Sequence, residues 1–244
     1  MDGQAETGQA PDRQDVDRAT WLEARRALLD EEIALTRARD RLAAARRALP
    51  RVRIEADYRF VGPEGALRLG DLFGPHRQLA VYHFMYGPDW DAGCPICSFW
   101  MDSLNGLTPH LAARGVSLVL VSAAPLEKLM AYRERMGWDM RWVSTGDGRF
   151  NRDFGVAFSG EDLAPEARIY NYGKAPTPGP EAPGFSTFER DADGAVYHCY
   201  SAYARGLEAF NAAYGLLDLM PRGRYEAGLP YPMAWLRRRD SYAG

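Results

Sequence analysis

Two cysteines that are separated by two residues are the side chains of this sequence best suited to chemistry. Cys94 and Cys97 enclose Pro95 and Ile96, and the 244 residues contain three cysteines in all. A thiolate is both a nucleophile and a metal ligand, so a pair at this spacing can serve thiol–disulfide exchange or metal binding. Three cysteines are too few for a disulfide scaffold in a chain of this length. The pair is therefore expected to be reactive.

The residues around the pair predict that it lies where a strand turns into a helix. Residues 79–86 form an apolar and aromatic run that ends at Gly-Pro, which is typical of a buried strand. Residues 98–114 have helical spacing and stop at Gly115. The N-terminus of a helix stabilises a thiolate through unpaired N–H groups and the helix dipole. We therefore expect Cys94 to be the exposed nucleophile and Cys97, one helical turn later, to be the shielded resolving thiol.

Other side chains near the pair are candidates for supporting roles. Pro95 fits the first position of the helix. His83 could reach the thiolate as a proton acceptor, although a hydrogen-bonded core histidine is the interpretation that the apolar strand favours. Trp90 could line a substrate groove or fill the core. Asp89 and Asp91 would raise the pKa of the thiol if they lay close to it.

The remaining elements must build a sheet that holds this turn. Residues 116–122 and 142–144 predict two more strands, with a helix between them that Pro125 opens and Gly137 ends. Short connections between alternating strands and helices imply parallel pairing. An irregular insertion follows at about 159–184, where prolines and glycines are frequent. Residues 185–190 and 195–201 then predict a hairpin, and residues 203–217 a closing helix.

The N-terminal part predicts one long helix. Thr20 and Glu23 form a capping-box pattern, and Pro50 closes the segment. An apolar residue recurs every seventh position from Trp21 to Leu49, which makes a narrow stripe. Packing across the domain is favoured over a homodimeric coiled coil, because Glu31 and alanines occupy the second row. The expected boundaries are a disordered leader at 1–17, the helix at 18–50, the domain at 51–218 and a tail packed on the domain at 219–244.

Composition narrows the expected partners and location. Apolar residues make up 46% and charged residues 26% of the chain, with a net charge of −3. A nucleic-acid or membrane partner is not expected, because no net positive field is available to gather phosphates. No apolar run approaches the roughly 20 residues of a membrane-spanning helix, and residues 1–17 lack the apolar core of a secretory signal. A cytoplasmic protein is expected.

The order of these elements, with Cys-x-x-Cys at the first strand-to-helix turn, resembles the thioredoxin fold over roughly residues 60–218. The resemblance implies an α/β architecture in which helices flank a central mixed sheet. The proline after the first cysteine is similar to the glutaredoxin version of the motif. The resemblance also implies a cis-proline before the hairpin that faces the dithiol, and Pro183 is the best match.

Two family resemblances bear on function. The stretch 150–156 is similar to a region of peroxiredoxins, but their motif needs Pro seven residues and Thr or Ser three residues before the attacking cysteine. Gly87 and Asp91 occupy these positions. The chain from Trp21 onward resembles a bacterial thioredoxin-like family, domain of unknown function 899, and this resemblance implies the fold more than a reaction. It is carried by His83-Phe-Met85, Gly93-Cys-Pro-Ile-Cys-Ser98, Arg135-Met-Gly-Trp138, Phe150-Asn151, Asp153-Phe-Gly155 and Tyr200-Ser-x-Tyr-x-Arg-Gly206.

The sequence therefore predicts a thiol–disulfide oxidoreductase that needs no cofactor and no metal. Its expected partners are a disulfide-bearing protein or a small thiol compound, and an electron donor that the sequence does not identify. A thiol peroxidase is the alternative enzyme. A non-catalytic module that binds a protein, zinc or copper is the third interpretation, but zinc needs four ligands. His198 and Cys199 are adjacent on a strand, so at most one of them could face the pair.

Overall fold

A computed structural model describes residues 13–164 and 166–242. Contacts divide the chain into two units, residues 1–50 and 51–244. The first unit holds α1 (Arg18–Arg47), in which no residue is buried. Its N-cap is Asp17, whose carboxylate accepts a hydrogen bond from Thr20 N at 2.8 Å, so the expected capping box at Thr20 is wrong by one turn. Most of the expected leader, residues 1–12, lies outside the described residues.

The described part of the second unit is built on a mixed sheet of eight strands in the order β1-β8-β7-β4-β5-β6-β2-β3. The strands are β1 (Val52–Arg53), β2 (Arg59–Gly62), β3 (Gly65–Arg68), β4 (Gln78–His83), β5 (Val116–Ser122), β6 (Arg141–Ser144), β7 (Gly184–Arg190) and β8 (Val196–Tyr203). β4, β5 and β6 are parallel, whereas β7 runs antiparallel to both β4 and β8. The thioredoxin-like mixed sheet that the sequence predicts is therefore confirmed.

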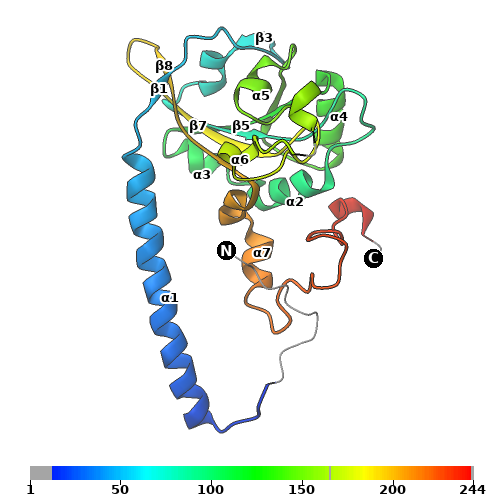
Figure 1. The fold of residues 1–244 in the computed structure, drawn as a ribbon. Helices are drawn as coiled ribbons and strands as arrows, with labels where there is room; N and C mark the ends of the chain where they lie inside the picture. The colour runs from blue at the N-terminus through cyan, green and yellow to red at the C-terminus, as the bar shows by residue number, and fades with distance from the viewer. Residues whose placement is uncertain (1–12, 165, 243–244) are drawn as a thin grey trace. The chain divides into compact units, whose positions relative to one another are not determined.

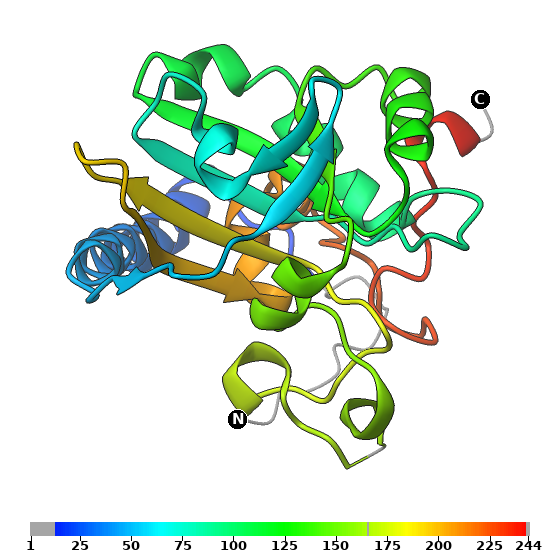
Figure 2. The same ribbon diagram turned by 90° about the horizontal axis from the view of Figure 1, so that it is seen from above.

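Helices cover both faces of this sheet, as Figures 1 and 2 show. They are η1 (Leu69–Phe73), α2 (Pro95–Leu104), α3 (Thr108–Ala112), α4 (Leu126–Arg135), α5 (Arg149–Asp153), η2 (Gly160–Leu163), α6 (Tyr170–Gly173), η3 (Ala204–Phe210), α7 (Ala212–Leu217) and η4 (Arg239–Ser241). Apolar side chains of α2, α4, η3 and α7 pack in one core cluster. Those of η1 and α5 pack in another.

Strand β4 separates these two clusters by the alternation of its side chains. Tyr82 belongs to the cluster with α2 and α4, whereas Leu79 and Val81 belong to the cluster with α5. Successive residues of a strand point to opposite faces of its sheet. The face on which each β4 side chain lies therefore decides whether it can meet the dithiol.

Two expected helices are interrupted in the structure. The one expected at 98–114 ends at Leu104, because Asn105 is extended and Gly106 takes a φ of 85°, before α3 begins. The one expected at 203–217 is the 3₁₀ helix η3 followed by α7, whose N-cap is Asn211. The asparagine side chain accepts a hydrogen bond from Tyr214 N at 2.9 Å, which starts a new helix at that point.

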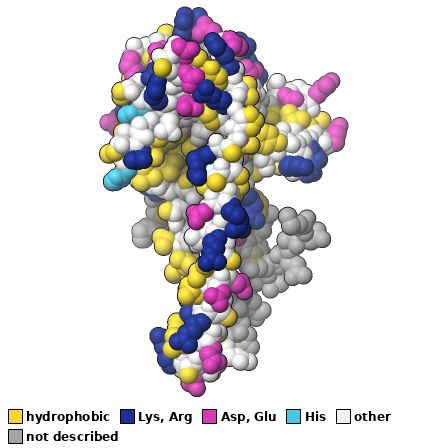
Figure 3. Space-filling view, turned by 90° about the vertical axis from the view of Figure 1, so that its left-hand side faces the viewer, with side chains coloured by type: hydrophobic (Ala, Val, Ile, Leu, Met, Phe, Trp, Pro, Cys, Tyr) yellow, Lys and Arg dark blue, Asp and Glu magenta, His cyan; other side chains and the backbone are white. Residues whose placement is uncertain are grey.

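Strands β2 and β3 form an antiparallel hairpin that the sequence analysis did not predict. Within its described residues, the expected insertion holds the short helices η2 and α6 and reaches the first residue of β7. Among the described residues, no helix combines the length and the apolar character that crossing a bilayer requires. On the face drawn in Figure 3, basic and acidic side chains are intermixed.

A glycine at the start of β7 is required by close packing. A Cβ atom at Gly184 would lie 2.8 Å from Val156 Cγ1 and 2.9 Å from Tyr203 Cε1. We expect Gly184→Ala to lower the free energy of unfolding by about 1–3 kcal/mol, because neighbours on both sides must shift. In Gly215→Ala, a control in helix α7, the Cβ atom meets nothing within 4 Å, so stability is kept or increased. Urea unfolding of both variants checks this, and equal stabilities would contradict it.

Candidate active site

The dithiol lies at the N-terminal end of α2. Cys94 is the N-cap residue of the helix and Pro95 occupies its first turn, as the sequence predicts. The backbone N–H of Cys94 donates to Met85 O at 3.1 Å, which ties the start of α2 to the segment that leaves β4. Ser98 Oγ donates to Cys94 O at 2.8 Å and reinforces the first helical turn.

The turn before Cys94 is packed so closely that only glycine fits. A Cβ atom at Gly93 would lie 2.7 Å from Phe84 Cε1 and 3.0 Å from Tyr132 Cε1. Both aromatic side chains are buried. This packing fixes the position from which the Cys94 side chain projects.

Both cysteines of the pair carry free thiols and both are buried, with 8% of Cys94 and 0% of Cys97 exposed. The deep burial of Cys97 agrees with the sequence-based expectation. The expectation of an exposed Cys94 is wrong, because the residue packs in the same apolar cluster as Cys97 and Trp90. Only a narrow part of the Cys94 surface remains open to solvent.

Hydrogen bonds favour the thiolate of Cys94. Its pKa is lowered, above all because the Cys97 thiol donates a hydrogen bond to its sulfur. Burial acts against this shift, whereas the backbone N–H groups of Cys97 and Ile96 and the positive charge of Arg238 add to it. N–H groups at a helix start are the usual means of stabilising a thiolate in proteins. Cys94 is thus the better nucleophile of the pair.

The pKa of the second thiol, Cys97, is shifted in the opposite direction. Complete burial raises the pKa of Cys97, and the neighbouring Cys94 sulfur raises it further. Met85 N donates to Cys97 Sγ at 3.5 Å, and the Tyr82 hydroxyl also hydrogen-bonds this sulfur. Cys97 therefore holds its proton while Cys94 is free to react.

A residue that is distant in sequence completes the surroundings of Cys94. Arg238 donates through Nε and Nη2 to Gly93 O, at 3.1 and 2.8 Å, and through Nε to the Tyr132 hydroxyl at 3.1 Å. The Tyr132 hydroxyl also meets Ser98 Oγ at 2.9 Å, and Ser98 bonds to Cys94 O. One guanidinium thus orders the backbone on both sides of the nucleophile.

His83 bonds to residues other than the thiols, so the less favoured interpretation of this residue as a proton acceptor for the thiolate is wrong. Its ring nitrogens bond to Asn151 Oδ1 at 3.3 Å and to Ser186 Oγ at 2.9 Å, and the ring stacks on Phe150. It follows Tyr82 in the strand and therefore faces the other side of the sheet. Burial lowers the pKa of His83 to about 4, which keeps the ring neutral. The interpretation that the sequence favoured, a hydrogen-bonded core histidine, is confirmed.

Pro183 and Trp90 both flank the strand end that carries the dithiol. Pro183 precedes Gly184, which pairs with His83 at the end of β4, and its carbonyl accepts a hydrogen bond from the Tyr170 hydroxyl at 2.6 Å. All peptide bonds of the described residues are trans, so the expected cis bond at Pro183 is wrong. Trans is the favoured isomer for an X–Pro bond. Trp90 packs against the core from the loop, and its carbonyl accepts from Lys128 Nζ at 3.2 Å.

The sequence analysis did not identify one carboxyl group, that of Glu181, which lies near the loop between β4 and α2. Burial raises the pKa of Glu181 to about 7, and the N–H of Tyr86 hydrogen-bonds its carboxyl group. Tyr86 directly follows Met85, which contacts Cys97. Glu181 can therefore exchange a proton near neutral pH beside the segment that joins β4 to the dithiol.

The other residues that were considered as metal ligands are engaged elsewhere. His198 Nε2 bonds to Ser201 Oγ at 2.8 Å. Cys199 lines an apolar cavity of about 540 Å³, together with Leu118 and Phe185. Within the described ranges, no three His, Cys, Asp or Glu side chains are grouped as a metal site would need.

Comparison with known sequences gives one family. The profile described as "Bacterial protein of unknown function (DUF899)" matches residues 11–242. None of the curated proteins compared with the chain matches it.

Several solved structures resemble the chain at low identity. Peroxidoxin BcpB of Mycobacterium tuberculosis has 18% identity and a TM-score of 0.45, covering 67% of this chain and 97% of that one. A cysteine-to-serine mutant of peroxiredoxin Q from Xanthomonas campestris has 20% identity and a TM-score of 0.43, covering 69% and 98%. A protein assigned as thiol:disulfide interchange protein DsbE from Chlorobium tepidum has 17% identity and a TM-score of 0.37, covering 66% and 93%. These TM-scores are too low to carry an inference of activity.

The positive charge of Arg238 should increase the thiolate fraction of Cys94. We expect wild-type Cys94 to be alkylated by iodoacetamide with a midpoint below the ordinary thiol pKa of about 8.5. In Arg238→Met the midpoint rises, and alkylation at pH 7 slows by about fivefold, because a nearby cation is lost. Peptide mass spectrometry against pH measures this. Arg237→Met is the matched control, since its side chain donates to the carbonyls of Ala234 and Leu236 rather than to the residues around Cys94. The same slowing in both variants would contradict the assignment.

The buried His83 should make the fold sensitive to acid. Its folded pKa of about 4 lies below the ordinary value of 6.5, so the unfolded chain binds the extra proton between these values. Stability is therefore lost as pH falls, by about 2 kcal/mol between pH 7 and pH 5 from this residue. Urea unfolding at both pH values should show a smaller loss in His83→Gln than in wild type. The exposed His110→Gln is the control, and an unchanged loss in His83→Gln would refute the assignment.

Proposed function

Because the chain belongs to DUF899, a family of bacterial proteins of unknown function, we propose its activity from the chemistry of its own site. The proposed activity is thiol–disulfide exchange, with Cys94 as nucleophile and Cys97 as resolving thiol. The single observation that carries this proposal is the asymmetry of the pair. A thiol with a lowered pKa begins helix α2, and its partner is a fully buried thiol with a raised pKa.

The exchange proceeds in two balanced steps. The Cys94 thiolate attacks one sulfur of a substrate disulfide, a mixed disulfide forms, and the other substrate sulfur leaves as a thiolate that takes up a proton. Cys97 then loses its proton and attacks Cys94 Sγ, which releases the second substrate thiol. The protein ends with a Cys94–Cys97 disulfide and has given two electrons to the substrate. An electron donor of unspecified identity must reduce it again.

Each surrounding group has a part in these steps. The N–H groups of Ile96 and Cys97 and the charge of Arg238 stabilise the attacking thiolate. After the first step the Cys94 sulfur is bonded covalently and no longer accepts the Cys97 proton, which must leave before Cys97 attacks. The Tyr82 hydroxyl and Met85 N, which contact Cys97, can stabilise the resulting negative charge.

Removing the resolving thiol should trap the first step. We expect Cys97→Ser to accumulate a mixed disulfide with bis(2-hydroxyethyl) disulfide, because no second thiol can release the adduct. Wild type should instead form an internal disulfide without a lasting adduct. Intact-mass spectrometry under non-reducing conditions distinguishes the two products.

The control is Cys94→Ser, in which the nucleophile is missing and no adduct should form. Adduct formation on Cys97 or Cys199 in that variant would contradict the assigned roles. Hydrogen peroxide in a parallel reaction tests the alternative enzyme. Oxidation of Cys94 to a sulfenic acid that outpaces disulfide exchange would favour a peroxidase.

A further inference from the structure

The segment that follows α7 is held against the domain by a carboxylate with three donors. We call residues 224–241 the C-terminal strap. Glu226 Oε1 accepts hydrogen bonds from the Tyr214 hydroxyl at 2.7 Å, Met233 N at 2.9 Å and Trp235 Nε1 at 2.8 Å. Two of these donors belong to the strap and the third to α7. One oxygen atom thus closes the strap into a loop and fastens it to the domain.

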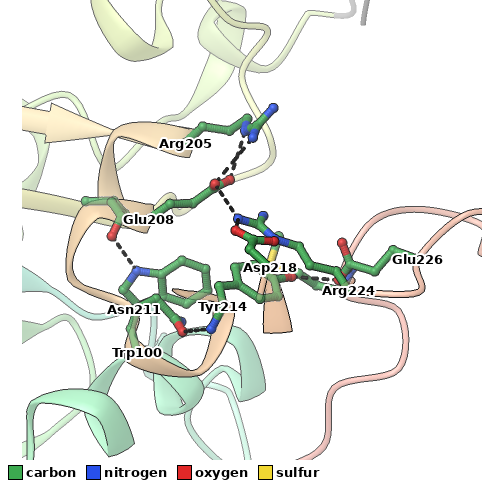
Figure 4. A network of polar contacts seen from close by, with 10 residues as sticks. Trp100, Arg205, Glu208, Asn211, Tyr214, Asp218, Arg224 and Glu226 are labelled. Carbon is green, nitrogen blue, oxygen red and sulfur yellow. Dashed lines mark hydrogen bonds and ion pairs between the residues drawn. The ribbon is translucent and has the colours of Figure 1, made fainter. Parts of the chain in front are cut away.

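A cluster of ion pairs anchors the beginning of the strap, as Figure 4 shows. Arg224 pairs with Glu208 at 3.1 Å and with Asp218 at 2.7 Å, and its guanidinium lies 4.0 Å from the centre of the Tyr214 ring. Arg205 reaches the same Glu208 at 2.8 Å. Arg224 and Glu208 are only 22% exposed, so this pair is better shielded than most surface pairs.

The far end of the strap is attached to the helices beside the dithiol. Asp240 pairs with Arg135 of α4 at 2.6 Å, and Arg239 pairs with Asp102 of α2 at 3.3 Å. Leu236 is buried, with 4% of its surface exposed. The strap is therefore fixed at both ends and in the middle.

Between these anchors, the strap crosses the turn that presents Cys94. Arg238 bonds to Gly93 O and to the Tyr132 hydroxyl, and Figure 2 shows η4 beside α4 and near the loop before α2. Lys128 Nζ holds the same loop through Pro88 O at 2.7 Å. The charge of Arg238 also acts on the Cys94 sulfur and helps to lower its pKa, and only 8% of Cys94 stays exposed.

We propose that the C-terminal strap determines the substrate class of Cys94: a low-molecular-weight disulfide reaches the sulfur, and a disulfide within a folded protein does not. The inference rests on the proposed thiol–disulfide exchange. Exchange begins only when a sulfur of the substrate disulfide can reach the Cys94 thiolate. A small linear disulfide meets this requirement within a narrow opening, whereas a folded protein brings its whole surface against the strap.

The test compares two disulfides in single turnovers of the reduced full-length chain. The probes are bis(2-hydroxyethyl) disulfide and native insulin, and the readout is formation of the Cys94–Cys97 disulfide by mass spectrometry after rapid quenching. The quantity of interest is the ratio of the two rate constants at one pH. Both reactions use the same thiolate, so this ratio does not depend on the pKa of Cys94.

The ratio of the two rate constants is also measured for free dithiothreitol, which corrects for the intrinsic reactivity of the two probes. Relative to that reference ratio, we expect wild type to favour the small disulfide over insulin by at least about tenfold. The double variant Glu226→Ala, Trp235→Ala loosens the strap and should bring the ratio towards that of dithiothreitol. Arg238→Met removes the contact with Gly93 but keeps the other anchors, so it gives a second readout if the double variant does not fold. Arg114→Ala, at an exposed position between α3 and β5, is the control and should keep the wild-type ratio.

Each outcome decides a different point. A wild-type ratio equal to that of dithiothreitol overturns the inference while leaving the exchange activity intact. A preference that survives in both strap variants also overturns it, because the strap is then not the cause. If neither probe oxidises the wild-type pair, the proposed function fails, and this inference fails with it.

Discussion

The site depends on the interaction between two neighbouring thiols of unequal burial. Cys97 is enclosed by the core and holds its proton, and this proton stabilises negative charge on Cys94. The N–H groups of α2 act in the same direction, but burial of Cys94 opposes them. An isolated buried thiol would have a raised pKa, so the partner thiol and the helix start are needed together. The fold supplies both by starting α2 directly after the loop that leaves β4.

The sheet keeps two polar systems apart although they begin on adjacent residues. Tyr82 contacts Cys97 on one face, and His83 joins Asn151 and Ser186 on the other. The second system continues through Ser201 to His198 and is buried against phenylalanines of α5 and its C-cap. It satisfies polar groups inside the core, as buried donors and acceptors require. A histidine so close to the pair in sequence is thus structural, because strand alternation places it on the face of the sheet away from α2.

Much of the fold could be predicted from the sequence, because its signals are local. Sequence patterns indicated the apolar runs of β4 and β5, the hairpin of β7 and β8, and the position of Pro95 in α2. The DUF899 profile matches residues 11–242, which confirms the family that the sequence resembles. The breaks at Gly106 and Asn211 were missed, since helical spacing continues across both. The N-cap was misplaced, because Asp17 and Thr20 are both good capping residues.

The contacts around Cys94 were harder to predict because they come from distant parts of the chain. Strand alternation places Tyr82 and His83 on opposite faces, but nothing local says which face α2 covers. Arg238 stands in a run of three arginines that suggested only a surface tail. Its contact with Gly93, and the burial of Glu181 beside Tyr86, exist only in the folded domain.

The long separation between Gly93 and Arg238 has a consequence for the newly made chain. The two residues are 145 positions apart, which a ribosome covers in about 7–30 s. During that interval the dithiol and its helix have already emerged, but the guanidinium that stabilises the thiolate has not. Until the strap has been made, the Cys94 thiol lacks this positive charge and is less acidic than in the finished chain.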